Sequence, residues 1–185
     1  MDYSKDYLSI VKERVSPHRY NHTLGVIKEA IRLAEIYNVD TDKARIAATL
    51  HDISKNKDIN EIIENVKNNF DPKVLSYPVG TIHAYDSKLE AIKLGVDDSD
   101  ILMAIESHAL ARPNMSTLEK IIYIADFTEE GREFIESKIA RDIATSSLNK
   151  AVYYILTEIK KYEESRGNTT PDISIDAINY YKDKD

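Results

Sequence analysis

Apolar positions along the chain recur at helical spacing almost throughout, and the alternation typical of strands is nearly absent. The first apolar stripe ends before Pro17, and the segment from His18 to about Tyr37 carries two neighbouring stripes that predict a wide buried face. Gly25 interrupts this segment. Because glycine costs about 1 kcal/mol relative to alanine inside a helix, we expect another backbone or a ligand to approach the helix there.

Capping residues, prolines and glycines divide the rest of the chain into further helices. We expect caps at Asp58 with Glu61, at Thr81, and at Ser116 with Glu119. Residues 71–80 are expected to form a loop that could hold one short helical turn. The further helices are expected at about 41–52, 58–69, 81–95, 97–108, 116–127, 134–166 (one long helix or two collinear ones) and 172–181. The pattern therefore predicts an all-α fold of roughly eight or nine helices.

Length and composition narrow the class of protein. With 185 residues, 42% of them hydrophobic and 31% charged, the chain is predicted to form a single globular domain. This domain would span 1–185, with a core at about 18–150 on which the C-terminal helices pack. The net charge of −7 argues against a nucleic-acid binder or a binder of anionic membranes. Because the start lacks an apolar signal core and no run approaches the roughly 18 apolar residues of a membrane span, a cytoplasmic protein is expected.

The candidate chemistry lies in histidines and carboxylates, because the chain has no cysteine to hold a metal. Four of the five histidines lie on inward faces or at the ends of separate expected helices, and two aspartates lie beside apolar runs. The candidate set is His22, His51, Asp52, His83, His108 and Asp126. Helix bundles commonly build metal sites from such inward side chains. Six nitrogen and oxygen ligands are too many for one tetrahedral site but suit two octahedral-like ions that share a bridging carboxylate.

Each of these residues also has an ordinary structural explanation. A single histidine beside an apolar stripe is more often hydrogen-bonded within a core, and Asp126 could be a capped or salt-bridged core carboxylate. His18 could cap the helix it opens, and it is left outside the candidate set. The coincidence of six potential ligands on otherwise apolar inward faces favours a metal centre over these separate explanations.

The order of the six candidate ligands resembles that of the HD-domain metal-dependent phosphohydrolases, and His83 with His108 matches the members that have a dinuclear centre. Residues 19–26 (RYNHTLGV), 51–55 (HDISK) and 115–132 (MSTLEKIIYIADFTEEGR) resemble the YqeK-type symmetrical diadenosine tetraphosphate hydrolases. The resemblance extends over most of the chain. It implies an HD-domain helical bundle that cleaves diadenosine tetraphosphate, or a related dinucleoside polyphosphate, into two ADP or GDP-type products.

We hypothesise that two metal ions share Asp52 as a bridging ligand. In this assignment the first ion is held by His22, His51, Asp52 and Asp126, and the second by Asp52, His83 and His108. The resemblance implies a di-iron centre, whereas ligand chemistry alone leaves manganese or cobalt open. A hydroxide that bridges the two ions would attack an inner phosphorus in line, and ADP would leave from the other side.

A polyphosphate substrate is strongly negative, so an acidic protein needs local cations to bind it. Lys55 lies one turn beyond His51 and is assigned, with Asp52, to the catalytic set. The candidate substrate contacts are Lys55, Arg132, Arg112, Arg19, Thr81 and Thr128. The arginines can bind phosphate with two parallel hydrogen bonds. Each cation could instead be a solvated surface residue, and Arg19 could pair with a carboxylate.

Other functions remain open from the sequence. The same site could act on another nucleotide, such as a dNTP, a mononucleotide or a cyclic dinucleotide, because a fold does not decide its substrate. A module without catalysis could instead bind a nucleotide or a partner protein. The chain could also be a homodimer with Tyr153-Tyr154 or Tyr180-Tyr181 in its interface, although tyrosines at helical spacing more often pack within a domain.

Overall fold

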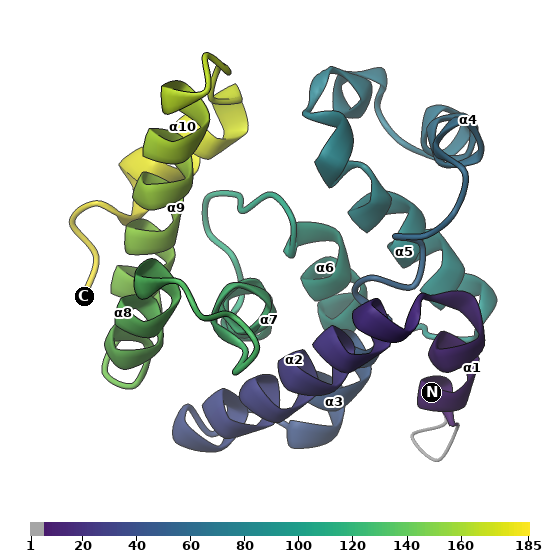
Figure 1. The fold of residues 1–185 in the computed structure, drawn as a ribbon, viewed down its shortest axis with the longest axis horizontal. Coiled ribbons are helices and arrows are strands. Elements are labelled where there is room, and N and C mark those ends of the chain that lie inside the picture. The colour runs from purple at the N-terminus through teal and green to yellow at the C-terminus, as the bar shows by residue number, and fades with distance from the viewer. Residues whose placement is uncertain (1–5) are drawn as a thin grey trace.

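The computed structural model describes residues 6–185, which form ten α-helices and two short 3-10 helices and no β-strand (Figure 1). The elements are α1 Tyr7–Arg14, α2 Pro17–Ile36, α3 Thr41–Leu50, α4 Ile59–Asn69, η1 Pro72–Ser76, η2 Val79–Thr81, α5 His83–Lys93, α6 Ser99–Ser107, α7 Thr117–Thr128, α8 Ile135–Ala144, α9 Leu148–Ser165 and α10 Asp172–Tyr181. The all-α prediction is confirmed. The helix count exceeds the predicted range by one because residues 134–166 form two separate helices.

Side-chain caps explain where most of these helices begin. An aspartate or serine side chain accepts a hydrogen bond from a first-turn backbone N–H group at Asp6, Ser16, Asp40, Asp58, Asp98, Ser116 and Ser147. The predicted capping box of Ser116 and Glu119 is confirmed. The predicted cap at Thr81 is wrong: the hydroxyl donates to the Pro78 carbonyl at 2.7 Å, and α5 begins later, at His83.

The prediction of one long helix or two collinear helices over 134–166 is also wrong. α8 and α9 pack against each other, because the three residues between them turn the chain back (Figure 1). Ser147 ends this turn and accepts a hydrogen bond from the Lys150 N–H, which starts α9 in its new direction. Periodicity alone does not reveal such a turn, since apolar positions continue at helical spacing on both sides of it.

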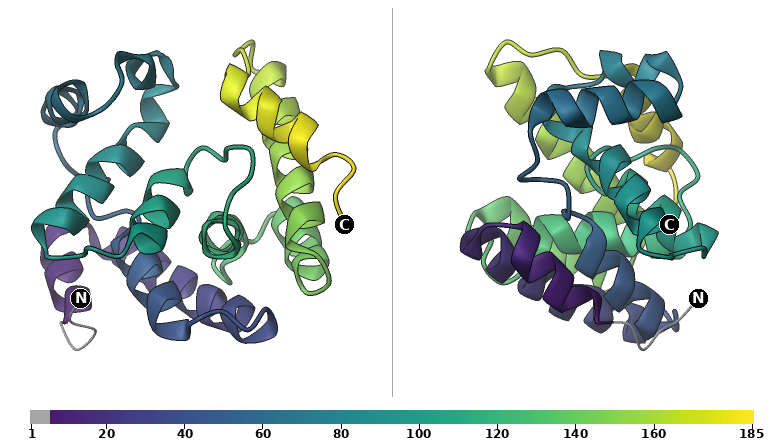
Figure 2. Two further views of the ribbon diagram at one scale, coloured as in Figure 1. Left: turned by 180° about the vertical axis from the view of Figure 1, so that it is seen from behind. Right: turned by 90° about the vertical axis from the view of Figure 1, so that its right-hand side faces the viewer.

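α7 lies at the centre of the molecule and contacts α2, α3, α6, α8 and α9 (Figure 1). Its isoleucines at 121, 122 and 124 are fully buried. α9 covers one side of α7, and α10, yellow in Figure 2, packs on α9. Tyr181 of α10 is buried and accepts a hydrogen bond from the Met115 N–H at 2.8 Å, so this tyrosine belongs to the core. Tyr153, Tyr154 and Tyr180 are half-buried against the same core.

A second, smaller apolar cluster positions the start of α5. Ile62 and Val66 of α4 pack with Val74, Ile82 and Tyr85. This cluster fixes the 3-10 segment that leads into α5, and with it the histidine at the helix start. Within residues 6–185, none of the helices combines the length and the apolar character that crossing a membrane requires.

Candidate metal centre

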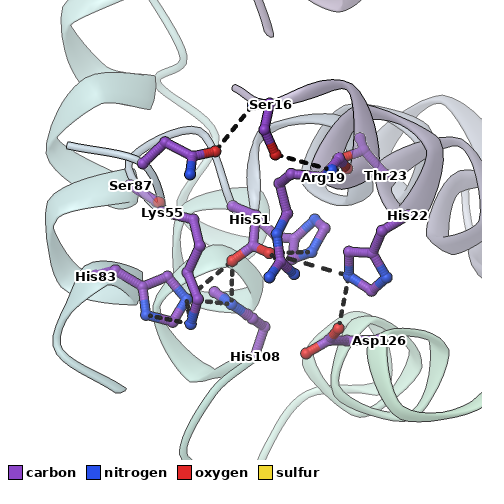
Figure 3. A network of polar contacts seen from close by, with 12 residues as sticks. Ser16, Arg19, His22, Thr23, His51, Lys55, His83, Ser87, His108 and Asp126 are labelled. Atoms are coloured by element: carbon purple, nitrogen blue, oxygen red, sulfur yellow. Dashed lines mark hydrogen bonds and ion pairs between the residues drawn. The ribbon is translucent and has the colours of Figure 1, made fainter. Parts of the chain in front are cut away.

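The six candidate ligands are brought together from five helices. His22 lies in the second turn of α2, His51 and Asp52 directly follow α3, His83 begins α5, His108 directly follows α6, and Asp126 lies in the last turn of α7. In Figure 3, His83 and His108 lie on one side of His51, and His22 with Asp126 lies on the other. The helix ends therefore converge on one point, which gives short side chains access to each other.

Asp52 lies between two pairs of histidines. Its Oδ1 is 2.9 Å from His83 Nε2 and 3.4 Å from His108 Nε2. Its Oδ2 is 3.5 Å from His51 Nε2 and 3.9 Å from His22 Nε2. Each carboxylate oxygen thus faces a different pair, and this is the arrangement that lets one aspartate bridge two ions.

The four histidines of the candidate set each donate a hydrogen bond outward from Nδ1 and point Nε2 toward the centre. The acceptors are Glu129 Oε1 for His22 (3.2 Å) and the carbonyls of Ala48 for His51 (2.6 Å), Gly80 for His83 (2.9 Å) and Ile105 for His108 (2.7 Å). These bonds select the neutral tautomer in which Nε2 is free to bind a metal, as in most metal-ligating histidines.

Buried polar atoms at the centre also fit a metal-binding site. When the histidines are neutral and carry their proton on Nδ1, the buried atoms Nε2 of His22, Nε2 of His51 and Oδ1 of Asp52 have no hydrogen-bond partner within the described part of the chain. His22 Nε2 does lie 3.0 Å from Asp126 Oδ1, which adds a second carboxylate to the same side. Burying polar atoms without partners is costly, and a divalent cation would satisfy them. Four imidazoles and two carboxylates suit iron, manganese, cobalt or zinc.

The protonation states of His51, His83 and Asp52 favour metal binding. Burial lowers the pKa of His51 to about 4 and also lowers the pKa of His83, so both rings are neutral at neutral pH. Burial alone would raise the pKa of Asp52, but the surrounding imidazoles hold it well below its usual range. Burial is the largest single effect on His22 and lowers its pKa, but the hydrogen bond and charge of Asp126, together with the hydrogen bond to Glu129, outweigh burial and raise this pKa. Because its pKa is lowered, the Asp52 carboxylate between the two pairs of histidines is ionised.

Three cations line the cavity at the candidate metal centre. A cavity of about 410 Å³, here named the metal cavity, reaches Asp52, and its wall includes Arg19, Lys55, Arg132 and Thr81. Arg19 donates from Nη1 to Asp52 Oδ2 at 2.8 Å. The structure thus brings four of the six predicted substrate contacts to a cavity that is also lined by four of the six candidate ligands, Asp52, His83, His108 and Asp126. Cations at such a cavity would attract an anionic substrate in spite of the net negative charge of the protein.

Arg112 and Thr128 are the two predicted substrate contacts that do not line the metal cavity. Arg112 donates from Nε and Nη2 to the buried carboxylate of Glu119, at 2.9 and 2.7 Å. Thr128 is buried and donates to the Ile124 carbonyl at 2.8 Å. Spacing from a ligand places a residue near the site, but it does not show which way the side chain turns.

Glu129 is a site residue that the sequence analysis did not include. Its buried carboxylate accepts from His22 Nδ1 and, at 2.6 Å, from the Gly131 N–H. A Cβ atom added to Gly25 would collide with Glu129 Oε2. The group that approaches Gly25 is therefore this side chain, which corrects the expectation of a backbone or a ligand. Two features of the sequence could have pointed to Glu129: the glycine inside the predicted helix, and the position of Glu129 almost one turn after the candidate ligand Asp126.

Known proteins are similar to this chain in sequence and in fold. The HD domain model matches residues 19–131. The symmetrical bis(5'-nucleosyl)-tetraphosphatase of Halalkalibacterium halodurans is 39% identical over 147 residues, covering 78% of this chain and 79% of its own. The Staphylococcus aureus protein of the same name is 34% identical over 180 residues, covering 95% and 93%.

A solved structure supports the same grouping. The crystal structure of a Clostridium acetobutylicum protein, described as a "predicted HD superfamily hydrolase involved in NAD metabolism", is 38% identical. It superposes with a TM-score of 0.92 and covers 100% of this chain and 99% of that one. The segment matched by the HD domain model is more than half of the chain and holds all six candidate ligands. The chain therefore belongs to the HD-domain family.

Proposed function

We propose that this protein hydrolyses diadenosine tetraphosphate, and related dinucleoside polyphosphates, symmetrically to two ADP or GDP-type products. The observation that carries the proposal is the position of Asp52, with one oxygen facing His83 and the other facing His51. Two-metal sites of this kind perform phosphoryl transfer to water. The two relatives named as symmetrical bis(5'-nucleosyl)-tetraphosphatases, at 39% and 34% identity, support the choice of substrate.

Two divalent ions bound here would supply an acidified water as nucleophile and would neutralise charge on the attacking and leaving oxygens. The residues that would hold the first ion are His22, His51, Asp52 and Asp126, and those that would hold the second are Asp52, His83 and His108. We propose iron as the native ion, with manganese or cobalt as substitutes, because the same nitrogen and oxygen donors accept all three.

The protein side chains would bind and orient the polyphosphate. Lys55 is held 3.3 Å from the Gly80 carbonyl, and Arg132 lies 3.3 Å from Asp126 Oδ1, so both cations stand at the edge of the ligand set. Burial lowers the pKa of Lys55, and the neighbouring Asp52 carboxylate opposes this change. Arg19 and the Thr81 hydroxyl complete the polar wall. Hydrolysis adds one water across the central anhydride bond, and ADP leaves as a stabilised phosphate anion.

Chromatography of the products tests this function. We expect the purified protein to convert diadenosine tetraphosphate to two ADP, to lose this activity with a chelator, and to regain it on addition of iron, manganese or cobalt. Metal analysis should give close to two ions per chain. ATP plus AMP as products, or faster turnover of a dNTP, a mononucleotide or a cyclic dinucleotide in the same assay, would show that the substrate assignment is wrong.

A further inference from the structure

Two further cavities adjoin the metal cavity. The aromatic cavity, about 690 Å³, is lined by Phe127, Arg132, Phe134, Ile159 and Tyr162 with charged residues of α8 and α9. The loop cavity, about 670 Å³, is lined by residues of the 76–81 segment, by Ala109 and Leu110, and by residues of α9 and of the segment before α10.

The three cavities share walls in a way that puts the metal cavity in the middle. Phe127, Arg132 and Phe134 line both the metal cavity and the aromatic cavity. Gly80, Thr81 and Ala109 line both the metal cavity and the loop cavity. Ile159 of α9 lines all three. A ligand that is centred on the metal site can therefore extend into a lateral cavity in each of two directions.

We propose that the aromatic cavity and the loop cavity are two nucleoside subsites that hold the two adenosines of one diadenosine tetraphosphate molecule. This inference rests on the proposed function and adds to it where each half of the substrate lies. The polyphosphate would cross the metal cavity, which places the central phosphates, and so the bond that is broken, beside Asp52.

The aromatic cavity has the surface that a purine base requires. Phe134 is 41% exposed and Tyr162 is 58% exposed, and the nearby Ile159 is 39% exposed. Phe127 packs edge-to-face on Phe134 with ring centroids 5.2 Å apart, which holds the exposed ring in place. Exposed aromatic rings bind bases by stacking, without regard to base identity. The charged residues of the same wall are two cations, Arg132 and Lys161, and two carboxylates, Glu136 and Glu158. Arg132, at the boundary with the metal cavity, lies where the first phosphates would pass.

The loop cavity offers a matching arrangement on its own side. Tyr77 lies in its wall and is half-buried against Tyr85, with ring centroids 6.4 Å apart. The boundary with the metal cavity is formed in part by Gly80, whose carbonyl accepts from Lys55 Nζ at 3.3 Å. Each lateral cavity thus has a tyrosine in its wall and adjoins a cation of the metal cavity, Arg132 on one side and Lys55 on the other. Such a repeated arrangement suits a molecule whose two halves are identical.

Cavity size agrees with this assignment. Binding sites for small organic ligands typically measure about 300–1,000 Å³, and both lateral cavities fall in this range. A substrate with one nucleoside would fill one of the two cavities, whereas a dinucleoside polyphosphate would fill both. The pair of cavities therefore favours a dinucleoside substrate over a mononucleotide.

Calorimetric titration of the metal-loaded protein with ADP tests the inference by counting sites. We expect two ADP per chain with similar affinity for the wild type, and for Tyr162→Leu or Tyr77→Leu one ADP at the wild-type affinity and a second bound about tenfold more weakly. Tyr180→Leu is the matched control, because this half-buried tyrosine lies in neither cavity, and it should keep two. If Tyr77→Leu unfolds, Ser76→Trp at an exposed position of the same wall provides a second variant, in which the added ring occupies the loop cavity and one ADP should bind per chain.

Steady-state kinetics provide the second measurement. Tyr162→Leu should lower kcat/KM for diadenosine tetraphosphate by about tenfold, the size of a lost base-stacking contact. The same variant should lower kcat/KM for adenosine tetraphosphate by no more than about twofold, because that molecule can place its single adenosine in either cavity. Hydrolysis of adenosine tetraphosphate at its central anhydride bond yields ADP and pyrophosphate.

The outcomes separate this inference from the proposed function. The two-subsite inference alone would be overturned by a wild-type protein that yields two ADP but binds one ADP per chain. It would also be overturned if the variants lowered kcat/KM equally for diadenosine tetraphosphate and adenosine tetraphosphate, or for neither. The wild type could instead bind two ADP, with the variants assigning one ADP to each cavity, and yet cleave no dinucleoside polyphosphate. That result would overturn the proposed function and leave the two subsites supported.

Discussion

Glu129 accepts a hydrogen bond from His22 Nδ1 at 3.2 Å, so His22 is held by a carboxylate where the other three histidines of the centre are held by backbone carbonyls. A carboxylate partner fixes the plane of an imidazole and makes it a more basic ligand. The backbone of Gly131 in turn orients Glu129 from its other oxygen. The orientation of one proposed metal ligand thus depends on a loop that follows α7.

Replacement of Glu129 should weaken metal binding without unfolding the protein. We expect Glu129→Ala to lower metal affinity by about 10–100-fold, the usual effect of removing the partner of a metal-binding histidine. Glu129→Gln should retain part of the affinity, because its amide oxygen can still accept from Nδ1. Competition against a chromogenic chelator measures the affinity. Glu130→Ala, at an exposed neighbour that pairs with Lys28, is the control that should leave it unchanged. Wild-type affinity in Glu129→Ala contradicts the role.

Gly25 and Glu129 should be energetically coupled. Gly25→Ala improves helix propensity by about 1 kcal/mol in isolation, but its Cβ would collide with Glu129 Oε2. We expect Gly25→Ala to lower both stability and metal affinity in the wild-type background, and to lower stability less, or raise it, in the Glu129→Ala background. A double-mutant cycle by urea unfolding measures this coupling. Additive effects of the two substitutions would show that the side chains do not compete for space.

Local signals explain why much of the fold could be predicted. Asp58 and Ser116 cap the helices that follow them within three residues, so their role depends on nearby backbone alone. The failure at Thr81 has a local cause as well, since its hydroxyl bonds to Pro78 and a 3-10 turn replaces the expected helix start. The turn at 145–147 was missed because serine and threonine are common in both turns and helix starts.

The candidate site could be predicted only where a candidate ligand stood out on an apolar face. His22 and Asp126 do so, and the structure places them 3.0 Å apart. The contact of Glu129 with His22 spans 107 positions in sequence, and no short-range pattern announces it. The partner of Arg112 and the lateral cavities likewise depend on how the helices pack. Spacing along the chain carries no information about these contacts.

The number of metal ions bound per chain should distinguish Asp52, the proposed ligand of both ions, from His83, a proposed ligand of one ion. Asp52 faces both histidine pairs, whereas His83 lies against Asp52 Oδ1 and His108. We expect Asp52→Asn to reduce bound metal from two ions per chain toward zero, and His83→Ala to reduce it to about one. Elemental analysis with protein quantification measures both, and helical circular dichroism should be retained. Equal loss in the two variants contradicts the bridging role of Asp52.

Lys55 should act on the substrate and not on the metal. Lys55 is half-buried and lines the metal cavity, so its loss would remove the charge-assisted contact to phosphate that we propose for it. We expect Lys55→Ala to raise KM for diadenosine tetraphosphate by roughly 10–100-fold, which corresponds to about 1.5–3 kcal/mol, with metal content unchanged. Lys28→Ala, at an exposed position on α2, is the charge-matched control. A fall in metal content would assign Lys55 to the metal centre instead.

Arg112 should stabilise the fold and leave catalysis unaffected. Its guanidinium binds both oxygens of Glu119, a carboxylate that is 1% exposed and that also accepts from the Ser107 hydroxyl and the Ser116 N–H. Removing one partner of a buried ion pair leaves an uncompensated charge, which typically costs about 3–5 kcal/mol. We take the lower value for Arg112→Ala, because two hydrogen bonds to Glu119 survive. For a chain of this size the midpoint of thermal unfolding should fall by roughly 6–12 °C. Below that transition, metal content and KM should match the wild type. A raised KM with unchanged stability would instead place Arg112 among the phosphate contacts, which its spacing from His108 also allows.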